Sequence, residues 1–275
     1  MKIWGLVTIT LRELSAKATL IVLAGISTLI ILGIFLSLSS SQVEDGINLM
    51  FFGSSVGSPV SHESLHEIVH GIQATLTKGL FWGIVLFGVI ATAGIIPSAL
   101  EKGTVDLYLS KPIARWELLL GKYLGAVVLM LFNIVYFLGA LWFVFGIKVG
   151  VWNSQFFLSS ITLTFVFACL FSIVALLGVL FRGPAIPIIG TFLYLFVGNL
   201  LEQREQVLYL ISENPMYQRI LDGLYYILPQ ISAMEANIAN QITQQGLDWR
   251  PFAQSILSAG MLFGGSVAIF SKRDF

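Results

Sequence analysis

The sequence predicts an all-α membrane protein whose single transmembrane domain, residues 1–275, holds six membrane-spanning helices. Only 11% of the residues are charged, whereas a typical soluble domain carries about 25%. The mean hydropathy is +0.87. A spanning helix needs ~20 mostly apolar residues. Six stretches meet this requirement, at about 18–38, 79–98, 123–147, 156–181, 185–201 and 252–270.

Charge and cysteine content exclude other classes of function. The formal net charge is zero, so the composition gives no basis for nucleic acid binding. The single cysteine, Cys169, lies in the middle of an apolar run. We therefore expect a small buried side chain there and no intrachain disulfide.

The first 17 residues are too polar to span a membrane but follow a helical pattern. Ile3, Val7, Leu11 and Leu14 recur at helical spacing, with Trp4 beside them. Trp and Lys side chains commonly anchor a helix at the membrane surface. We predict a helix in the inner interface of the bilayer, with a plain cytosolic extension as the alternative.

The distribution of basic residues predicts the orientation in the membrane. With six spans, both termini lie on one side, and the segments on that side carry ten Lys and Arg residues against five in the other loops. An excess of Lys and Arg marks the cytoplasmic face. The sequence thus predicts a multi-pass protein of a bacterial-type plasma (inner) membrane with both termini in the cytoplasm.

This topology leaves two long external segments, residues 39–78 and 202–251. The second has enough apolar residues to lie in the outer interface but too many charges to span. Pro disfavours helix at the residue before it. We therefore predict two short interfacial helices there, broken at Asn214–Pro215 and near Pro229.

A charged block, residues 99–122, interrupts the apolar sequence on the cytoplasmic side. Ser98 and Glu101 have the spacing of a capping box, which predicts a helix starting directly after the second span. Gly103 allows a turn, and Pro112 favours the start of a new helix. That helix is expected to continue without a break into the third span, with Lys122 on a polar face. An amphipathic loop lying on the lipid headgroups is the alternative.

The block resembles the signature that follows the second span in type-2 ABC transporter permeases. The matching residues are Glu101, Gly103, Thr104, Leu109, Ser110, Pro112, Arg115, Glu117, Gly121, Lys122 and Gly125. The sequence "LREL" at 11–14 and the Leu-Pro segment at 225–237 agree with this family. The resemblance implies a type V exporter-like fold.

The family resemblance also implies partners and site residues. The block corresponds to a coupling helix that docks in a groove on a cytosolic ABC ATPase, and two permease subunits pair with two ATPase subunits. We expect a homodimer of the permease, with a pair of different permeases as the alternative. The turn at 182–184 would be a second, smaller contact with the ATPase. The implied coupling residues are Glu101, Lys102, Gly103, Thr104, Asp106, Leu109, Ser110, Pro112, Arg115 and Arg182. Independently of the resemblance, Gly121 and Gly125 have the G-x-x-x-G spacing that permits close helix packing.

The sequence lacks the motifs of a catalytic chain. No G-x-x-x-x-G-K-[ST] loop occurs to cradle ATP phosphates, so we expect ATP and Mg to bind a partner subunit and no cofactor to bind this one. The predicted spans contain no Asp, Glu, Lys, Arg or His in their central parts, which disfavours a proton-driven carrier. Their polar residues Asn133 and Asn199 are expected to form helix–helix hydrogen bonds.

Three histidines lie in one external segment. His62, His66 and His70 are spaced four residues apart on a predicted short helix that starts after Ser61 and stops at Gly71. Two histidines at this spacing can share one metal ion, so His62 and His66 are candidate ligands. One permease subgroup of the family serves copper-enzyme maturation. A solvated or interfacial helix face is the alternative.

The leading prediction is therefore a permease subunit that couples the ATP cycle of a partner to substrate export or to mechanical work on an external protein partner. The alternatives are a non-transporting membrane scaffold that anchors an external complex, and a metal-handling maturation component. No residue identifies the substrate or the direction of transport.

Overall fold

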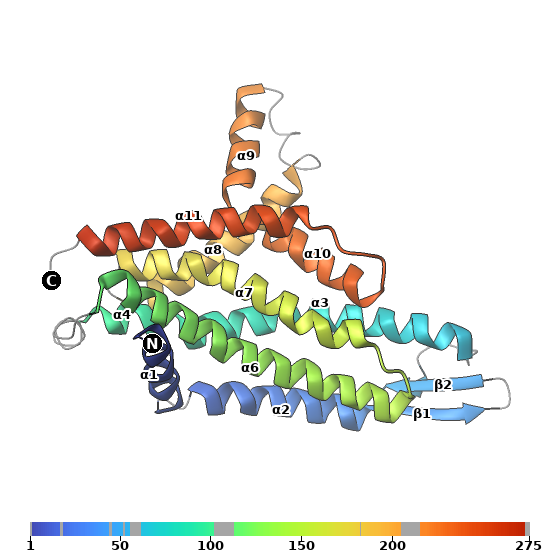
Figure 1. Ribbon diagram of the computed structural model, residues 1–275. Helices are drawn as coiled ribbons and strands as arrows, with labels where there is room; N and C mark the ends of the chain where they lie inside the picture. The colour runs from blue at the N-terminus through green and yellow to red at the C-terminus, as the bar shows by residue number, and fades with distance from the viewer. Residues whose placement is uncertain are drawn as a thin grey trace.

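The computed structural model describes residues 2–16, 19–43, 46–51, 53–55, 62–101, 113–181, 183–204 and 215–272. These residues form an elongated helical bundle with a small β-sheet at one end (Figure 1). The helices are α1 (Lys2–Ala16), α2 (Thr19–Ser37), α3 (His62–Thr92), α4 (Ile95–Ala99), α6 (Arg115–Val149), α7 (Ser154–Leu180), α8 (Ala185–Glu202), α9 (Pro215–Ile227), α10 (Ile231–Ile242) and α11 (Arg250–Lys272).

Helix α7 forms the centre of the bundle. It packs against α6 on one side and α11 on the other, and it also contacts α3, α8 and α10 (Figure 1). Most of its most apolar stretch is buried inside the protein, whereas α8 and α11 leave most of theirs exposed. Cys169 is buried on α7, as predicted.

Five helices of the described residues are long and apolar enough to cross a membrane. They correspond to the second to sixth predicted spans: the α3–α4 unit, α6, α7, α8 and α11. The first predicted span is α2, whose apolar part, Ile21–Ser37, is shorter. Helix α2 packs along α6 within the bundle (Figure 1). A multi-pass membrane protein is thus supported, whereas the count of six spans stays a prediction.

A small antiparallel sheet follows α2 directly, which the all-α prediction did not include. Its strands are β1 (Leu38–Val43), β2 (Gly46–Phe51) and β3 (Ser54–Ser55), in the order β1-β2-β3. Leu38 pairs with Phe51 and Val43 with Gly46. The Ser40 hydroxyl donates to the carbonyl oxygen of Lys148 at 2.5 Å, which ties the sheet to the end of α6.

The short histidine helix predicted to stop at Gly71 is instead the first part of α3, which continues to Thr92. A glycine inside a helix costs only about 1 kcal/mol. Leu65, Val69 and Ala74 are buried in the core on both sides of Gly71, so their packing keeps the helix continuous.

The cytoplasmic block is described only at its flanks. Ser98 lies inside α4 and its hydroxyl donates back to the carbonyl oxygen of Ile95 at 3.2 Å, so the predicted capping role of Ser98 is wrong. Helix α6 starts at Arg115, after an extended Ala114, rather than at Pro112. The predicted unbroken continuation into the third span is confirmed, because α6 runs to Val149.

The second external segment contains α9 and α10, with the predicted break near Pro229. Helix α9 projects from the bundle (Figure 1) and has no buried residue. Helix α10 is buried rather than interfacial: Ile231, Met234, Ile238 and Ile242 pack in the core, and α10 contacts α3 and α7. The contacts with α3 and α7 show that protein covers the apolar face that was predicted to lie in the interface.

The two asparagines of the spans differ in their hydrogen bonds. Asn133 on α6 accepts from the Ser27 hydroxyl of α2 at 3.3 Å, which confirms the predicted helix–helix contact. Asn199 donates to the carbonyl oxygen of Leu195 within α8, so that prediction is wrong for Asn199.

Helix α1 crosses α6 at its two predicted packing glycines. A Cβ atom at Gly121 would overlap the Leu6 side chain, and one at Gly125 would lie 2.6 Å from the Thr10 Cβ atom. Leu6, Thr10 and Leu14 are buried in this contact. The helix predicted to lie on the membrane surface therefore packs on protein. Val7 and Leu14 of its predicted apolar face are buried, and so are Leu6 and Thr10.

Replacing Gly121 or Gly125 with alanine is expected to lower the free energy of unfolding by about 1–3 kcal/mol, because the new methyl group must displace α1. Thermal unfolding of the purified protein in detergent measures the effect. Gly83→Ala is the matched control, since nothing lies within 4 Å of a Cβ atom at Gly83 of α3. Equal behaviour of the three variants would contradict the close packing.

Candidate coupling site

The described flanks of the charged block lie at one end of the bundle, where α1, α4, the start of α6 and the end of α11 come together (Figure 1). Of the predicted coupling residues, Glu101 and Arg115 are described. Glu101 is exposed directly after α4, and Arg115 is the first residue of α6. The remaining predicted coupling residues lie outside the described part of the chain: Lys102, Gly103, Thr104, Asp106, Leu109, Ser110, Pro112 and Arg182.

Two polar contacts fix the start of α6. The Glu117 carboxylate accepts a hydrogen bond from the backbone N–H of Ala114 at 2.8 Å, which satisfies a donor that a helix start leaves free. Arg115 donates through Nη1 to the carbonyl oxygens of Ser271 at 3.0 Å and Phe270 at 3.4 Å. A cation is favoured at the C-terminal end of a helix. The end of α11 is thereby attached to the start of α6.

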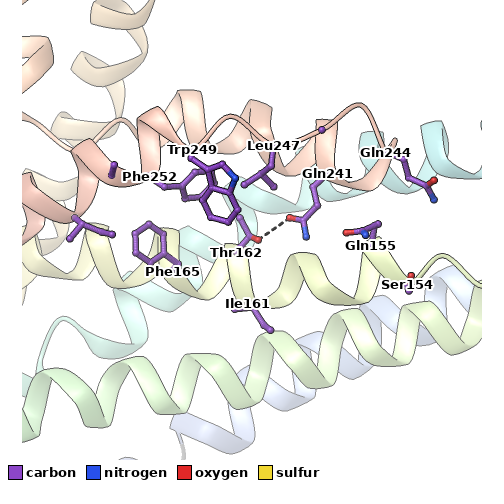
Figure 2. Close-up of a pocket in the computed structure, with 13 residues that line it drawn as sticks. Ser154, Gln155, Ile161, Thr162, Phe165, Gln241, Gln244, Leu247, Trp249 and Phe252 are labelled. Atoms are coloured by element: carbon purple, nitrogen blue, oxygen red, sulfur yellow. Dashed lines mark hydrogen bonds between the residues drawn. The ribbon is translucent and has the colours of Figure 1, made fainter.

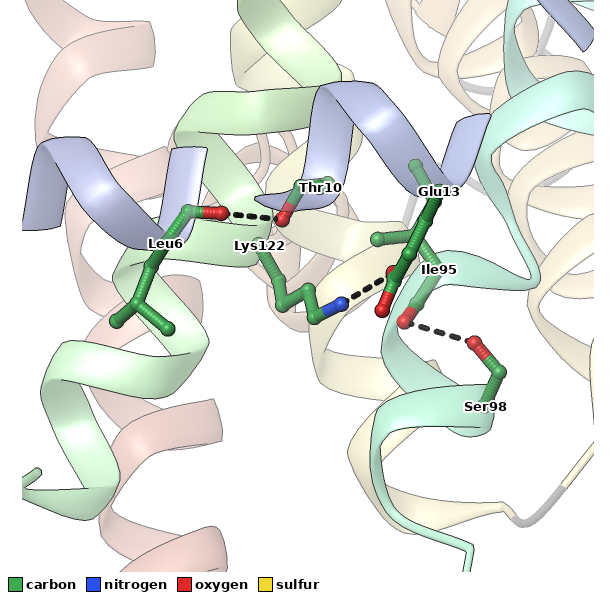
Figure 3. Close-up of polar contacts among 6 residues, drawn as sticks. All are labelled: Leu6, Thr10, Glu13, Ile95, Ser98 and Lys122. Carbon is green, nitrogen blue, oxygen red and sulfur yellow. Dashed lines mark hydrogen bonds and ion pairs between the residues drawn. The ribbon is translucent and has the colours of Figure 1, made fainter. Parts of the chain in front are cut away.

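An ion pair joins α1 to α6 one turn further along. The Lys122 ammonium group donates to the Glu13 carboxylate at 2.5 Å (Figure 3). The Lys122 side chain is 2% exposed and that of Glu13 is 37% exposed. Lys122 was predicted on a polar face of α6, and α1 covers that face and supplies the opposite charge.

The described flanks of the block belong to a junction of packed helices. Thr10 is 0% exposed, and its hydroxyl donates to the carbonyl oxygen of Leu6 at 2.8 Å, so no polar group of Thr10 is left unsatisfied against Gly125 (Figure 3). On the other side, a Cβ atom at Gly178 of α7 would lie 3.3 Å from the Ile96 side chain of α4. A force applied between Glu101 and Arg115 therefore acts on packed helices at both flanks.

The histidines lie at the opposite end of the bundle. His66 is exposed and His70 is partly buried, with their ring centroids 6.2 Å apart. The side chain of His62 lies outside the described residues. Among the residues that the structure describes, no group of three or more His, Cys, Asp or Glu side chains is placed to hold a metal ion. Metal binding by His62 and His66 stays a prediction.

A buried polar cluster joins α3, α7 and α10 at this same end. Asn153 donates through Nδ2 to Gln73 Oε1 at 2.9 Å and to the carbonyl oxygen of Ile242 at 3.0 Å. Its Oδ1 atom accepts from the backbone N–H of Gln155 and caps α7. Glu235 on α10 is 8% exposed, and its Oε1 atom has no hydrogen-bond partner among the described residues.

The pKa of Glu235 is raised. Burial is the larger cause, because it disfavours the charged carboxylate, and the ammonium group of Lys78 opposes it by lowering the pKa. The ionised carboxylate is therefore a source of instability at neutral pH.

A comparison with protein families decides the class of the chain. The profile described as "ABC-2 family transporter protein" matches residues 18–275. The chain belongs to this family. Among curated protein sequences none matches significantly.

As an ABC-2 transporter protein, the chain is the membrane permease component of an ABC transporter and works with a cytosolic ATPase. The match confirms the family that the charged block was found to resemble. Such permeases are generally non-catalytic components. The match is to the family as a whole, so the copper-maturation subgroup stays a prediction. Helix α1 lies before the matched residues.

Sequence reasoning missed how this ABC-2 permease attaches α1 to its coupling region. Thr10 lies four residues after Leu6 and three before Glu13, and Gly125 lies four residues after Gly121 and three after Lys122. Residues at these spacings lie on the same side of a helix. Complementary spacing and charge were the available signals, but nothing in the sequence states that these two faces meet.

Replacing Glu13 with glutamine is expected to destabilise the protein by about 1–2 kcal/mol, because Lys122 stays buried without the opposite charge of its carboxylate partner. The value lies below that of a fully buried pair because Glu13 is 37% exposed. Thermal unfolding measures it, and a double-mutant cycle with Lys122→Met isolates the pair. Arg12→Gln, at the exposed neighbouring position, is the control. Equal losses for Glu13 and Arg12 would contradict the assigned role.

Replacing Glu235 with glutamine is expected to stabilise the protein by about 1 kcal/mol at neutral pH, since an unsatisfied buried carboxylate is removed. A raised folded-state pKa means that the folded protein binds the proton more tightly, so stability falls as pH rises through the ordinary carboxyl range. The advantage should therefore vanish at about pH 4. Melting curves across pH test this, with the exposed Glu67→Gln as control. A pH-independent difference would refute it.

Proposed function

We propose that this chain couples ATP hydrolysis by a partner ATPase to export of a substrate or to mechanical work on an external partner. The supporting observation is the anchoring of both flanks of the block. Glu101 follows directly on α4, which packs against α6 and α7, and Arg115 is bonded to the last carbonyl oxygens of α11.

Helix α6 provides the path of the movement. It extends over Arg115–Val149, which is about 52 Å at ~1.5 Å per residue. Its far end carries Lys148, whose carbonyl oxygen accepts from Ser40 of the sheet. A displacement of the block by an ATPase therefore reaches the opposite end of the protein through one continuous helix.

The arrangement proposed for the working unit follows the family. Two copies of the permease pair as a homodimer with two ATPase subunits, each of which binds ATP and Mg. The end with α1, α4 and the C-terminal end of α11 faces the cytoplasm of a plasma membrane of bacterial type. The opposite end, with the β-sheet, α9 and α10, faces outward.

Reversing the charge of Glu101 or Arg115 is expected to reduce substrate-coupled ATP hydrolysis roughly tenfold, the effect of losing about 1.4 kcal/mol of charge-assisted contact. Co-purification of the ATPase and its activity in reconstituted bilayers are measured together. Arg219→Glu on the exposed surface of α9 is the control, because it lies outside the coupling region.

The outcomes separate the proposal from a scaffold. Normal membrane insertion with lost ATPase binding or lost coupling in either variant supports the permease role. Unchanged coupling in both variants overturns the assignment of the block. A chain that purifies without an ATPase, while external proteins co-purify, favours the membrane scaffold instead.

A further inference from the structure

A cavity of about 900 Å³ lies between α7, α10 and α11 at the outward end, away from the coupling site (Figure 2). It is lined by side chains from the first half of α7, the end of α10, the loop that follows it and the start of α11. None of its described lining residues is ionisable. The cavity therefore suits a ligand whose bound part carries no charge.

Polarity changes along the length of the cavity. Ser154, Gln155 and Gln244 lie at one end, and Phe165 and Phe252 lie at the other (Figure 2). The polar end is the outer end, because Ser154 is the first residue of α7 and follows the turn that joins it to α6. A lipid in the outer leaflet has the same arrangement, because its polar group lies outward and its hydrocarbon chains lie inward.

The depth of the cavity is close to the thickness of the hydrocarbon part of one leaflet. Ser154 and Phe165 are about 16 Å apart along α7 at ~1.5 Å per residue. The hydrocarbon core of a bilayer is about 30 Å thick, so this distance is about half of it. Ile161 and Ile256, which also line the cavity, are 62% and 56% exposed. The cavity is thus open sideways to the region where lipid chains lie.

A hydrogen-bond donor is held at the wall of the cavity. The Thr162 hydroxyl donates to Gln241 Oε1 at 2.8 Å (Figure 2). This bond uses the oxygen of the amide and leaves its Nε2 donor for a ligand acceptor. Gln244 lies nearby with a left-handed backbone, at φ 61°, which is an uncommon conformation for a residue other than glycine.

Aromatic side chains mark the same level as the membrane interface. Trp249 lines the cavity, and Trp152 and Trp142 pack 4.7 Å apart at the adjacent α6–α7 turn. Trp is enriched at membrane–water interfaces. The amide donors therefore lie near the depth at which the ester carbonyl groups of lipids are found.

From this geometry we infer that the cavity is a binding site for an ester-linked lipid of the outer leaflet. One acyl chain packs against Phe165, Phe252 and Ile256, and its ester carbonyl oxygen accepts a hydrogen bond from the Gln241 amide. The charged headgroup stays outside, in water. This site is separate from the coupling block and does not depend on the ATPase.

Photolabelling tests the site with the full chain in bilayers that contain phosphatidylcholine with a diazirine on one acyl chain. Labelling of the segments 154–165 and 249–256 is expected to exceed that of Ile189 and Leu193, which are exposed on α8. Ala253→Trp fills the cavity and should lower the labelling roughly tenfold, as displacement of about two buried methylene groups predicts. Leu257→Trp, exposed and outside the lining, is the matched control.

The carbonyl contact is tested separately. An ether-linked analogue with the same chain lacks the acceptor, so its labelling should be weaker than that of the ester, and Gln241→Leu should abolish the difference. Thermal unfolding of each variant verifies that it is folded. Labelling no greater than on α8, or unaffected in Ala253→Trp, overturns the site.

A second copy of the chain is the competing occupant. With Cys169 replaced by alanine, Ile161→Cys is the sole cysteine. Efficient disulfide formation between two copies in the bilayer would show that protein covers the cavity, and would overturn lipid binding. Absence of that cross-link together with chain-directed labelling supports the lipid.

Discussion

The close approach of α1 and α6 is the constraint on which the coupling end depends. Gly121 and Gly125 remove the side chains that would separate the helices, and the backbones come close enough for Glu13 to reach Lys122. A buried ammonium group is costly unless it is paired. The glycines and the charged residues therefore depend on each other. The Glu13–Lys122 ion pair requires the short distance between α1 and α6, and the ion pair in turn stabilises that short distance.

The two ends of the protein use different physical means to hold their helices. At the coupling end, charged groups act: the Glu13–Lys122 pair, and Arg115 at the carbonyl end of α11. At the opposite end, neutral amides join the helices, with Asn153 connecting α3, α7 and α10. Neutral amides keep their hydrogen bonds when a site is dry, whereas charges favour a site that borders water.

The fold could be predicted from the sequence where the apolar pattern of one helix is enough to identify that helix. The spans predicted from apolar length match α7, α8 and α11, and the break near Pro229 follows from proline geometry. The start of α6 before its apolar span was predicted from Pro112 instead. The wrong predictions concern which element packs against which. Helix α10 was expected at the membrane surface, and the covering of Lys122 by α1 was not predicted, because periodicity shows that a face is apolar or charged but not which element covers it.

Predictions from local sequence signals were also wrong where packing in the folded protein outweighed those signals. Gly71 did not end α3, since buried residues on either side keep the helix intact. Ser98 has the spacing of a cap but lies within α4. The coupling residues between 102 and 112 rest on family resemblance, whereas their flanks rest on contacts that the structure describes.

The order of synthesis gives the α1–α6 contact a further consequence. Glu13 and Lys122 are 109 residues apart in the chain. At ~5–20 residues per second, α6 follows α1 from the ribosome roughly 5–20 s later. During that interval the face formed by Leu6, Thr10 and Leu14 has no α6 to cover it. Until α6 has been synthesised, this face of the N-terminal helix must therefore be covered by the membrane surface or by a chaperone.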